Sequence, residues 1–406
     1  MKDSWNLTQG QQLVHCFLLD PKVYISLVAK LKGNITIEEI MNAVTKAYTQ
    51  NETTMSKIVF ENGNVYFEKM AQTGCKVFVD SREWLDIMHE NEKNAFRINE
   101  GELFRIFIIP NEEMQEYTLF MMAHHIIGDG KSLLLLLEDI LANISGKEVE
   151  YRPLNNDGAQ LPANGIKSAF IVRVVLKMLN RMWNKEGKVF NWEDYFYIHK
   201  HFWKDKASDV RVETRDCDEI EQIKAKCKEL GITVNSYIIT EVLREHPEYQ
   251  NFSLTLSIRG ENRSISNKVS SLRIVHAYDV QKSFEENAKQ IHALVKEHLE
   301  DERKRYAIFL NVKEMDHNLL DASLMYTHTG YQNKIAAILA SRIGYCGKDR
   351  TKTCVTNLNK ISIEPDYGRF RLENVFGIAA PMSAVENVIC VGTYDNKMTV
   401  VYTEVR

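Results

Sequence analysis

The feature that most constrains the fold is an apolar strand that ends in two histidines and turns into a helix. Residues Tyr117–Ala123 are largely apolar, which is typical of a strand buried on both faces. The run His124-His125-Ile126-Ile127-Gly128-Asp129-Gly130 follows, and Gly130 permits a tight turn. Ser132 is suited to cap a helix that extends to about Ile144. This order predicts a mixed α/β fold.

Both halves of the chain repeat this mixture of strands and helices. Thr36 and Glu39 form a capping box before an amphipathic helix, and an Asn-Gly pair at 62–63 joins two strands of a β-hairpin. The other patterns predict strands at 21–31, 57–60, 65–69, 104–109, 251–258, 388–393 and 398–404, and helices at 218–230, 233–245 and 282–299.

The length of 406 residues suits two domains of roughly 200 residues each. The polar stretch from Gly146 to Asn164 contains two prolines and predicts the edge of the first domain. We therefore expect an N-terminal lobe at 1–164 and a C-terminal lobe at 206–406. Between them, residues 165–205 form a basic amphipathic helix and an aromatic segment.

Composition excludes some classes of protein. A net charge of −4 is too acidic for a general nucleic-acid binder. Seven scattered cysteines without a CxxC pair are typical of reduced thiols. The N-terminus lacks the apolar core of a signal peptide, and no uncharged apolar stretch approaches the roughly 20 residues that span a bilayer. We expect a cytoplasmic protein.

The histidine pair alone is compatible with three roles. Two histidines at the end of a strand can be hydrogen-bonded members of the core. They can bind zinc or iron together with Asp129, although neighbouring strand residues point to opposite faces and rarely share one ion. In the third role, one histidine takes up a proton near neutral pH, and the N-terminus of the following helix favours a developing negative charge.

The string His124-His125-x-x-x-Asp129-Gly130-x-Ser132 resembles the signature of the superfamily that contains chloramphenicol acetyltransferase, the BAHD plant acyltransferases and the condensation domains of nonribosomal peptide synthetases. Further segments resemble the same superfamily in the same order, so that the resemblance covers nearly the whole chain. These are Leu7-Thr8-Gln9 with Asp20-Pro21, Phe96–Arg105, Gly231–Asn235, Thr356–Asn359, Phe376-Gly377 and Pro381.

The resemblance implies two chloramphenicol-acetyltransferase-like lobes, each a mixed sheet flanked by helices, with an active-site tunnel between them. It implies that His125, the second histidine, is the general base that deprotonates a hydroxyl or amine, which then attacks a thioester. Asp129 is then structural and pairs with Arg259, which follows the apolar run Leu254–Ile258; the alternative is that Arg259 is a surface arginine at a strand end. Thr356 is either a hydroxyl near the tetrahedral intermediate or an ordinary strand residue.

The same resemblance implies no permanently bound cofactor or metal. Acyl-CoA or a phosphopantetheine thioester on an acyl carrier protein is the expected co-substrate, and a small molecule is the acceptor. Two segments depart from the superfamily pattern: Val375–Ala379 lacks the Asp and Trp of the BAHD DFGWG loop, and Asn51–Met55 replaces a condensation-domain motif. The donor and acceptor therefore cannot be transferred from a relative. A catalytically silent module that recruits partners to an assembly line is the alternative function.

The helix expected at Lys167–Lys185 is basic. Arg173, Lys177, Arg181 and Lys185 recur every fourth residue, beside a stripe of Phe170, Val174, Met178 and Met182, and no acidic residue occurs before Glu186. One interpretation is a linker helix that packs its apolar stripe on the lobes with the cations outward. The alternatives are peripheral contact with an anionic membrane, an acidic carrier protein or the phosphates of CoA.

Overall fold

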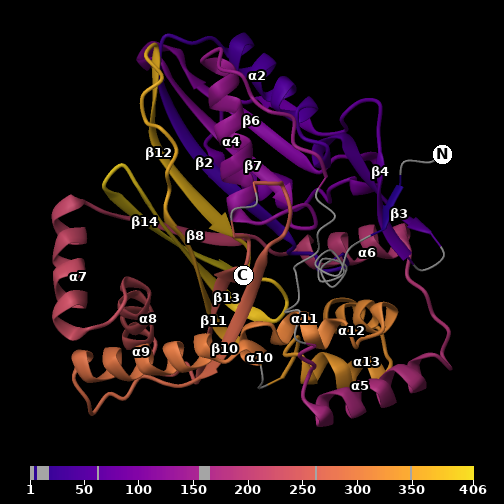
Figure 1. Ribbon diagram of the computed structural model, residues 1–406. Helices are drawn as coiled ribbons and strands as arrows, with labels where there is room; N and C mark the ends of the chain where they lie inside the picture. The colour runs from indigo at the N-terminus through magenta and orange to yellow at the C-terminus, as the bar shows by residue number, and fades with distance from the viewer. Residues whose placement is uncertain (1–3, 7–17, 62–63, 155–164, 261–262, 348–349) are drawn as a thin grey trace.

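The computed structural model describes residues 4–6, 18–61, 64–154, 165–260, 263–347 and 350–406 (Figure 1). Three features predicted from the sequence lie outside these ranges. They are the Leu7–Gln9 segment, the Asn-Gly pair of the hairpin turn, and residues 155–164 of the predicted edge of the first domain. Within the described ranges, no helix is long and apolar enough to cross a membrane.

The first large sheet contains the strand that carries the histidine pair. Its order is β12-β2-β7-β6-β5, and all neighbours are antiparallel except β5 and β6. Helices α2 and α4 pack against each other beside this sheet (Figure 1). The bounds are β2 Tyr24–Gly33, α2 Ile37–Thr49, β5 Lys76–Val79, β6 Phe104–Asn111, β7 Glu116–His124, α4 Gly130–Ile144 and β12 Phe370–Ala379.

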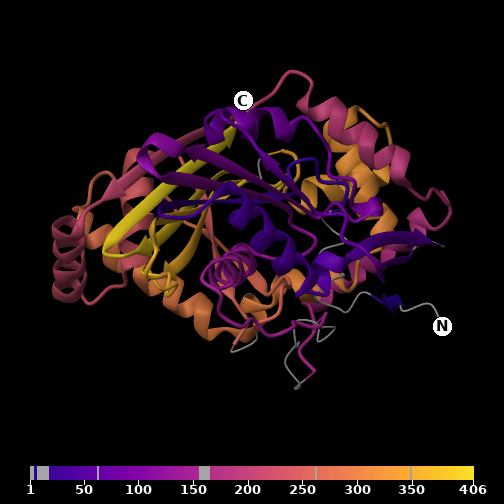
Figure 2. The same ribbon diagram turned by 90° about the horizontal axis from the view of Figure 1, so that it is seen from above.

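The second large sheet is built from the C-terminal half. Its order is β10-β9-β11-β13-β14-β8, and β11 pairs in parallel with both β9 and β13. Helices α7, α8 and α9 accompany it, and α7 lies at one end of the molecule in both views (Figure 1, Figure 2). The bounds are β8 Ser208–Arg215, α7 Cys217–Leu230, α8 Val234–Glu245, β9 Asn251–Ser257, β10 Val269–Val275, α9 Phe284–Glu300, β11 Thr351–Lys360, β13 Val385–Tyr394 and β14 Lys397–Val405.

The remaining elements lie beside these sheets. A small sheet has the order β1-β4-β3, and a group of helices including α5, α6, α12 and α13 packs at the opposite end of the molecule from α7 (Figure 1). The bounds are β1 Ser4–Asn6, β3 Ser56–Glu61, β4 Asn64–Lys69, α3 Trp84–Glu92, α5 Phe170–Trp183, α6 Trp192–Trp203, α10 Glu302–Arg305, α11 Ala307–Val312, α12 His317–Thr329 and α13 Lys334–Arg342; three short 3₁₀ turns are η1 Thr53–Met55, η2 Ile98–Glu100 and η3 Glu112–Met114.

The predicted fold class is confirmed, because each large sheet is mixed and flanked by helices. The proposed division at residues 164 and 205 stays a prediction. Strand β12 belongs to the C-terminal half of the sequence, yet it pairs with β2 from Gly33 to Ile25 and completes the first sheet. The chain therefore crosses between the lobes more than once, and a single cut in the sequence does not separate them.

Two local expectations are wrong. Asp129, not Ser132, caps helix α4, because the Asp129 carboxylate accepts from the backbone N–H of Ser132, which is the third helical residue. In α5, the side chains at Phe170, Val174, Met178 and Met182 are exposed, whereas Leu176, Leu179 and Trp183 are buried. The apolar stripe named from the sequence therefore faces away from the lobes.

Candidate active site

Strand β7 delivers the two histidines to a loop that is held on both sides. His124 is the last residue of β7 and lies opposite Tyr24 of β2. The backbone N–H of His124 donates to the carbonyl of Leu103 at 3.1 Å, and that of His125 donates to the carbonyl of Val23 at 3.0 Å. These bonds fix the strand end, so that the two side chains leave the backbone in different directions.

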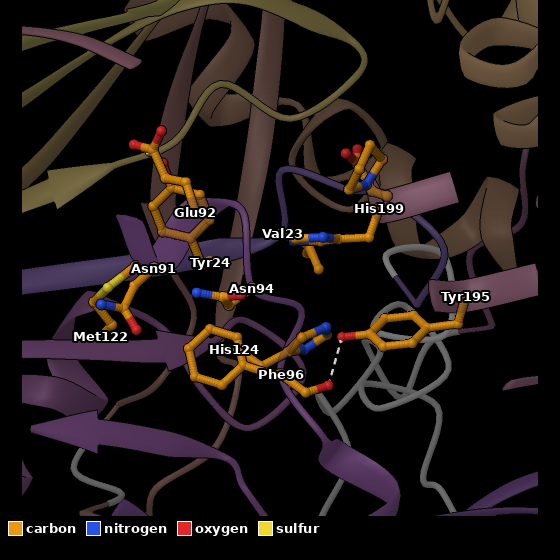
Figure 3. Close-up of a pocket in the computed structure, with 12 residues that line it drawn as sticks. Val23, Tyr24, Asn91, Glu92, Asn94, Phe96, Met122, His124, Tyr195 and His199 are labelled. Atoms are coloured by element: carbon orange, nitrogen blue, oxygen red, sulfur yellow. Dashed lines mark hydrogen bonds between the residues drawn. The ribbon is translucent and has the colours of Figure 1, made fainter. Parts of the chain in front are cut away.

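His124 points into the core beside helix α6 (Figure 3). Its Nδ1 accepts from the backbone N–H of Ile126 at 3.1 Å, and its ring packs against Phe96 and Tyr195. Burial lowers the pKa of His124 to about 3, which keeps the ring neutral. The space that it lines together with His199 measures only about 10 Å³. That space is too small for an organic substrate, and the His124 ring is surrounded by the rings of Phe96 and Tyr195.

His125 lies at the junction of the two lobes and is partly exposed. The side-chain Nδ2 of Asn267, from the C-terminal half, lies 3.3 Å from the ring Nδ1 and 3.5 Å from the backbone oxygen of His125. Burial lowers the pKa of His125 below its ordinary value of 6.5, opposed by the backbone carbonyls of His125 and Gly128 and by the charge of Asp129. The lowered pKa favours the neutral form of the ring, which can take up a proton.

Asp129 and Arg259 form a buried ion pair between the lobes. Arg259 Nη2 donates to Asp129 Oδ1 at 2.8 Å, and the two side chains are 5% and 2% exposed. The other carboxylate oxygen accepts from the backbone N–H of Lys268 at 3.0 Å. With these donors around it, Asp129 is turned toward this clamp and not toward His125. The pairing that the resemblance implies is present in the structure.

Residues 263–268, called the clamp segment below, were not singled out by the sequence. Ser132 on α4 donates to the carbonyl of Ser266 at 3.0 Å and accepts from the backbone N–H of the same residue at 3.2 Å. Arg259 also donates to Ser132 Oγ at 2.9 Å, and Thr53 donates to the carbonyl of Ile265 at 3.1 Å. The sequence signal that was available for this segment is its run of polar residues after strand β9.

The two glycines of the motif allow close packing around the loop. A Cβ atom at Gly128 would lie 2.5 Å from Ser132 Oγ and 2.6 Å from Ser132 Cβ. A Cβ atom at Gly130 would lie 2.8 Å from the end of the Leu358 side chain. The first clash is with a buried residue that is held by several hydrogen bonds, whereas the second is with the tip of a flexible side chain. Gly128 is therefore the more restrictive position.

A cavity of about 520 Å³ lies between the lobes next to this loop. Gly130 and Lys131, the first residues of α4, line it together with Thr255, Arg305 and Thr356. Thr255 Oγ1 donates to Thr356 Oγ1 at 2.8 Å. His125 is not among the described residues of the lining, and Asp129 is its only described acidic residue. Because Arg259 neutralises the Asp129 carboxylate, Lys131 and Arg305 give the cavity lining a positive charge.

The six cysteines within the described ranges are free thiols. In the same part of the chain, no three His, Cys, Asp or Glu side chains gather as a metal site would require. The structure thus brings together His125, Asp129, Gly130, Arg259 and Thr356 around the junction of the lobes. It separates His124 from them.

Comparison with known proteins identifies the fold. No family model matches the chain. In sequence, it is 24% identical over 125 residues to surfactin synthase subunit 1 of Bacillus subtilis (strain 168), which covers 30% of this chain and 4% of the relative. A plipastatin synthase of the same organism is 25% identical over 125 residues and is covered to 5% of its length. The chain thus spans a small part of the curated relatives that it matches, and the activity of those whole proteins is not carried over.

Solved structures match almost the whole chain. The trichothecene 15-O-acetyltransferase TRI3 of Fusarium sporotrichioides has a TM-score of 0.65 and 12% identity, with 99% of this chain and 90% of that chain covered. The condensation domain of the monacolin K polyketide synthase MokA has a TM-score of 0.63 and 10% identity, with 99% and 92% covered. The chain therefore has the two-lobed fold of condensation domains and of this acetyltransferase, which confirms the resemblance at the level of the fold.

Proposed function

We propose that the protein is an acyltransferase that moves an acyl group from a thioester to a hydroxyl or amine, with His125 as the general base. The observation that carries the proposal is the position of His125. Its imidazole lies at the junction of the lobes, 3.3 Å from Asn267 Nδ2 and one short loop from a cavity of about 520 Å³, and burial lowers its pKa. A positioned base of this kind contributes about 10²–10⁴-fold to the rate.

In the proposed reaction, the acceptor hydroxyl or amine gives its proton to the ring nitrogen of His125 that carries no hydrogen; this is Nε2 in the tautomer that has its hydrogen on Nδ1. The acceptor oxygen or nitrogen bonds to the thioester carbonyl carbon, and the carbonyl oxygen becomes an oxyanion. When this intermediate collapses, the C–S bond breaks and the proton passes from His125 to the sulfur. The products are an ester or amide and a free thiol.

The charge of the cavity supports a thioester donor with a phosphate group. Lys131 and Arg305 line it, and Gly130 begins a helix of 15 residues whose N-terminus favours an anion. Both acyl-CoA and a phosphopantetheine arm carry phosphate. Thr356 accepts a hydrogen bond from Thr255, so its own hydroxyl hydrogen can donate to an oxyanion.

The test is the release of free thiol from a panel of acyl-CoAs in the presence of alcohols and amines. We expect His125→Ala to reduce turnover by about 10²–10⁴-fold. His246→Ala is the matched control, because that histidine is exposed and pairs only locally with Glu248. Unchanged turnover in His125→Ala refutes the base. Thiol release by no donor, including a phosphopantetheinyl carrier protein, favours the silent recruitment module instead.

A further inference from the structure

Helix α5 exposes an apolar face that the lobes do not cover. The side chains of Phe170, Ile171, Val174, Met178 and Met182 are between 41% and 75% exposed. Isolated exposed apolar residues are normal on a protein surface, but five on three and a half turns of one helix form a continuous patch. Their spacing places them on one side of the helix.

The opposite side of α5 fixes the helix to the protein. Leu176, Leu179 and Trp183 are buried. Asn180 donates to the carbonyl of Glu314 at 2.8 Å and accepts from the backbone N–H of Asp316 at 3.1 Å. These contacts fix the orientation of α5, so the exposed face points away from the lobes.

A basic stripe borders the apolar patch. Lys177, Arg181 and Lys185 are exposed, and Arg173 lies partly exposed above the Phe170 ring. Each of the first two cations precedes an exposed methionine by one residue, so the basic and apolar stripes run side by side. No Asp or Glu occurs from Gly158 to Lys185, although the whole chain has a net charge of −4. Positive charge is thus concentrated where the apolar side chains protrude.

The neighbouring helix α13 extends this surface. It packs beside α5 at the edge of the molecule (Figure 1) and exposes Ile338, with Lys334 and Arg342 exposed one turn before and after it. Residues four apart share one face of a helix, so Ile338 and its two flanking cations lie together on α13. Both α5 and the adjacent α13 therefore expose apolar residues beside cations.

We infer that α5 and the adjoining face of α13 dock on an anionic lipid surface, with the exposed apolar side chains inserted among the acyl chains and the cations at the headgroups. A convex helix with a narrow basic border has the amphipathic form that lies in a membrane interface. An anionic bilayer supplies both partners for the cations and an apolar interior for the protruding side chains. The inference concerns a surface outside the proposed active site and does not depend on acyl transfer.

Vesicle flotation with the 406-residue chain tests the inference. We expect the protein to float with vesicles of equal parts phosphatidylcholine and phosphatidylglycerol, and not with phosphatidylcholine alone. Each cation near an anionic surface contributes about fivefold to partitioning, so Lys177→Glu with Arg181→Glu should weaken binding by about 25-fold or more. Phe170→Gln with Ile171→Gln and Met178→Gln should weaken it at unchanged charge, and by more than about tenfold on burial of this much apolar area.

The matched control is Val275→Gln with Val280→Gln, which changes two equally exposed apolar residues in the second lobe and should float like the parent. Unchanged melting temperatures show that the variants fold. Failure of the parent to float with the anionic vesicles overturns the inference. Flotation of the triple Gln variant at the level of the parent also overturns it, because binding would then be electrostatic only. Binding to polyglutamate without flotation would assign the surface to an acidic protein partner.

Discussion

The ion pair between Asp129 and Arg259 gives the sharpest prediction about stability. Replacing Arg259 with alanine removes its bonds to Asp129 Oδ1, to Ser132 Oγ and to the carbonyls of Ser264 and Ser266. The Asp129 carboxylate then stays buried, with the backbone N–H groups of Ser132 and Lys268 and the Ser132 hydroxyl as its remaining donors. Loss of one partner of such a pair costs about 3–5 kcal/mol, and the three remaining donors place the expected cost at the lower end, at about 3 kcal/mol.

The measurement is urea unfolding followed by tryptophan fluorescence, with Arg263→Ala as the matched control. Arg263 lies in the clamp segment, and it also bonds across to α4, through Glu138, but the two side chains are 57% and 40% exposed. Exposed pairs contribute about 0–1 kcal/mol, so the control should unfold close to the parent. Exchanging both partners for uncharged residues, in Asp129→Asn with Arg259→Met, should recover part of the loss. If Arg259→Ala unfolds at the same urea concentration as Arg263→Ala, the reasoning about the buried pair is wrong.

Three further predictions concern single residues. Because burial lowers the pKa of His125, kcat/KM should fall on the acid side with its midpoint below pH 6.5, whereas a midpoint above pH 6.5 would contradict the lowered pKa. Gly128→Ala should destabilise the protein by about 1–3 kcal/mol through its clash with Ser132, and Gly130→Ala by less, as thermal unfolding would show. Burial lowers the pKa of Lys22 from 10.5 to about 8. Between these pH values the unfolded chain binds more protons at Lys22 than the folded chain does. The free energy of unfolding therefore rises by about 3 kcal/mol as the pH rises through this range. Lys22→Met should therefore be more stable than the parent at pH 7, and urea unfolding at pH 7 and pH 10 should show this advantage shrinking.

Local patterns in the sequence were sufficient for much of the fold. Thr36 and Glu39 form the expected capping box, and the apolar run before the histidines is the buried strand β7. The expected cap of α4 was displaced by three residues, since both Asp129 and Ser132 are good capping residues at a strand-to-helix turn. Local propensity alone does not choose between Asp129 and Ser132 as the N-cap. The clamp segment decides it, because the Ser132 hydroxyl donates to the carbonyl of Ser266.

The error in α5 has a different physical origin. Periodicity shows that a helix has an apolar stripe, but it does not show which side meets the body of the protein. In α5 there are two apolar sides, and the one that contains Leu176, Leu179 and Trp183 packs inward. The stripe of Phe170, Val174, Met178 and Met182 is left outside, and only a tertiary structure shows this.

The site itself could be predicted only in part, since its residues come from both halves of the chain. The alternation of side chains along β7 sends His124 into the core and His125 to the junction of the lobes, which a sequence can indicate. The residue that orients His125 is Asn267, which lies 142 positions further along the chain and belongs to no recognisable motif.

The position of His125 and the stability of the lobe interface are therefore set by the same group of contacts. Asp129 caps α4, holds Arg259 and accepts from Lys268, and the residue before Lys268 is Asn267. Any change that releases the clamp segment from α4 also removes the partner of the His125 ring. We therefore expect Arg259→Ala to lose activity because His125 is displaced. The burial of His124, and with it the lowered pKa of that residue, should stay unchanged.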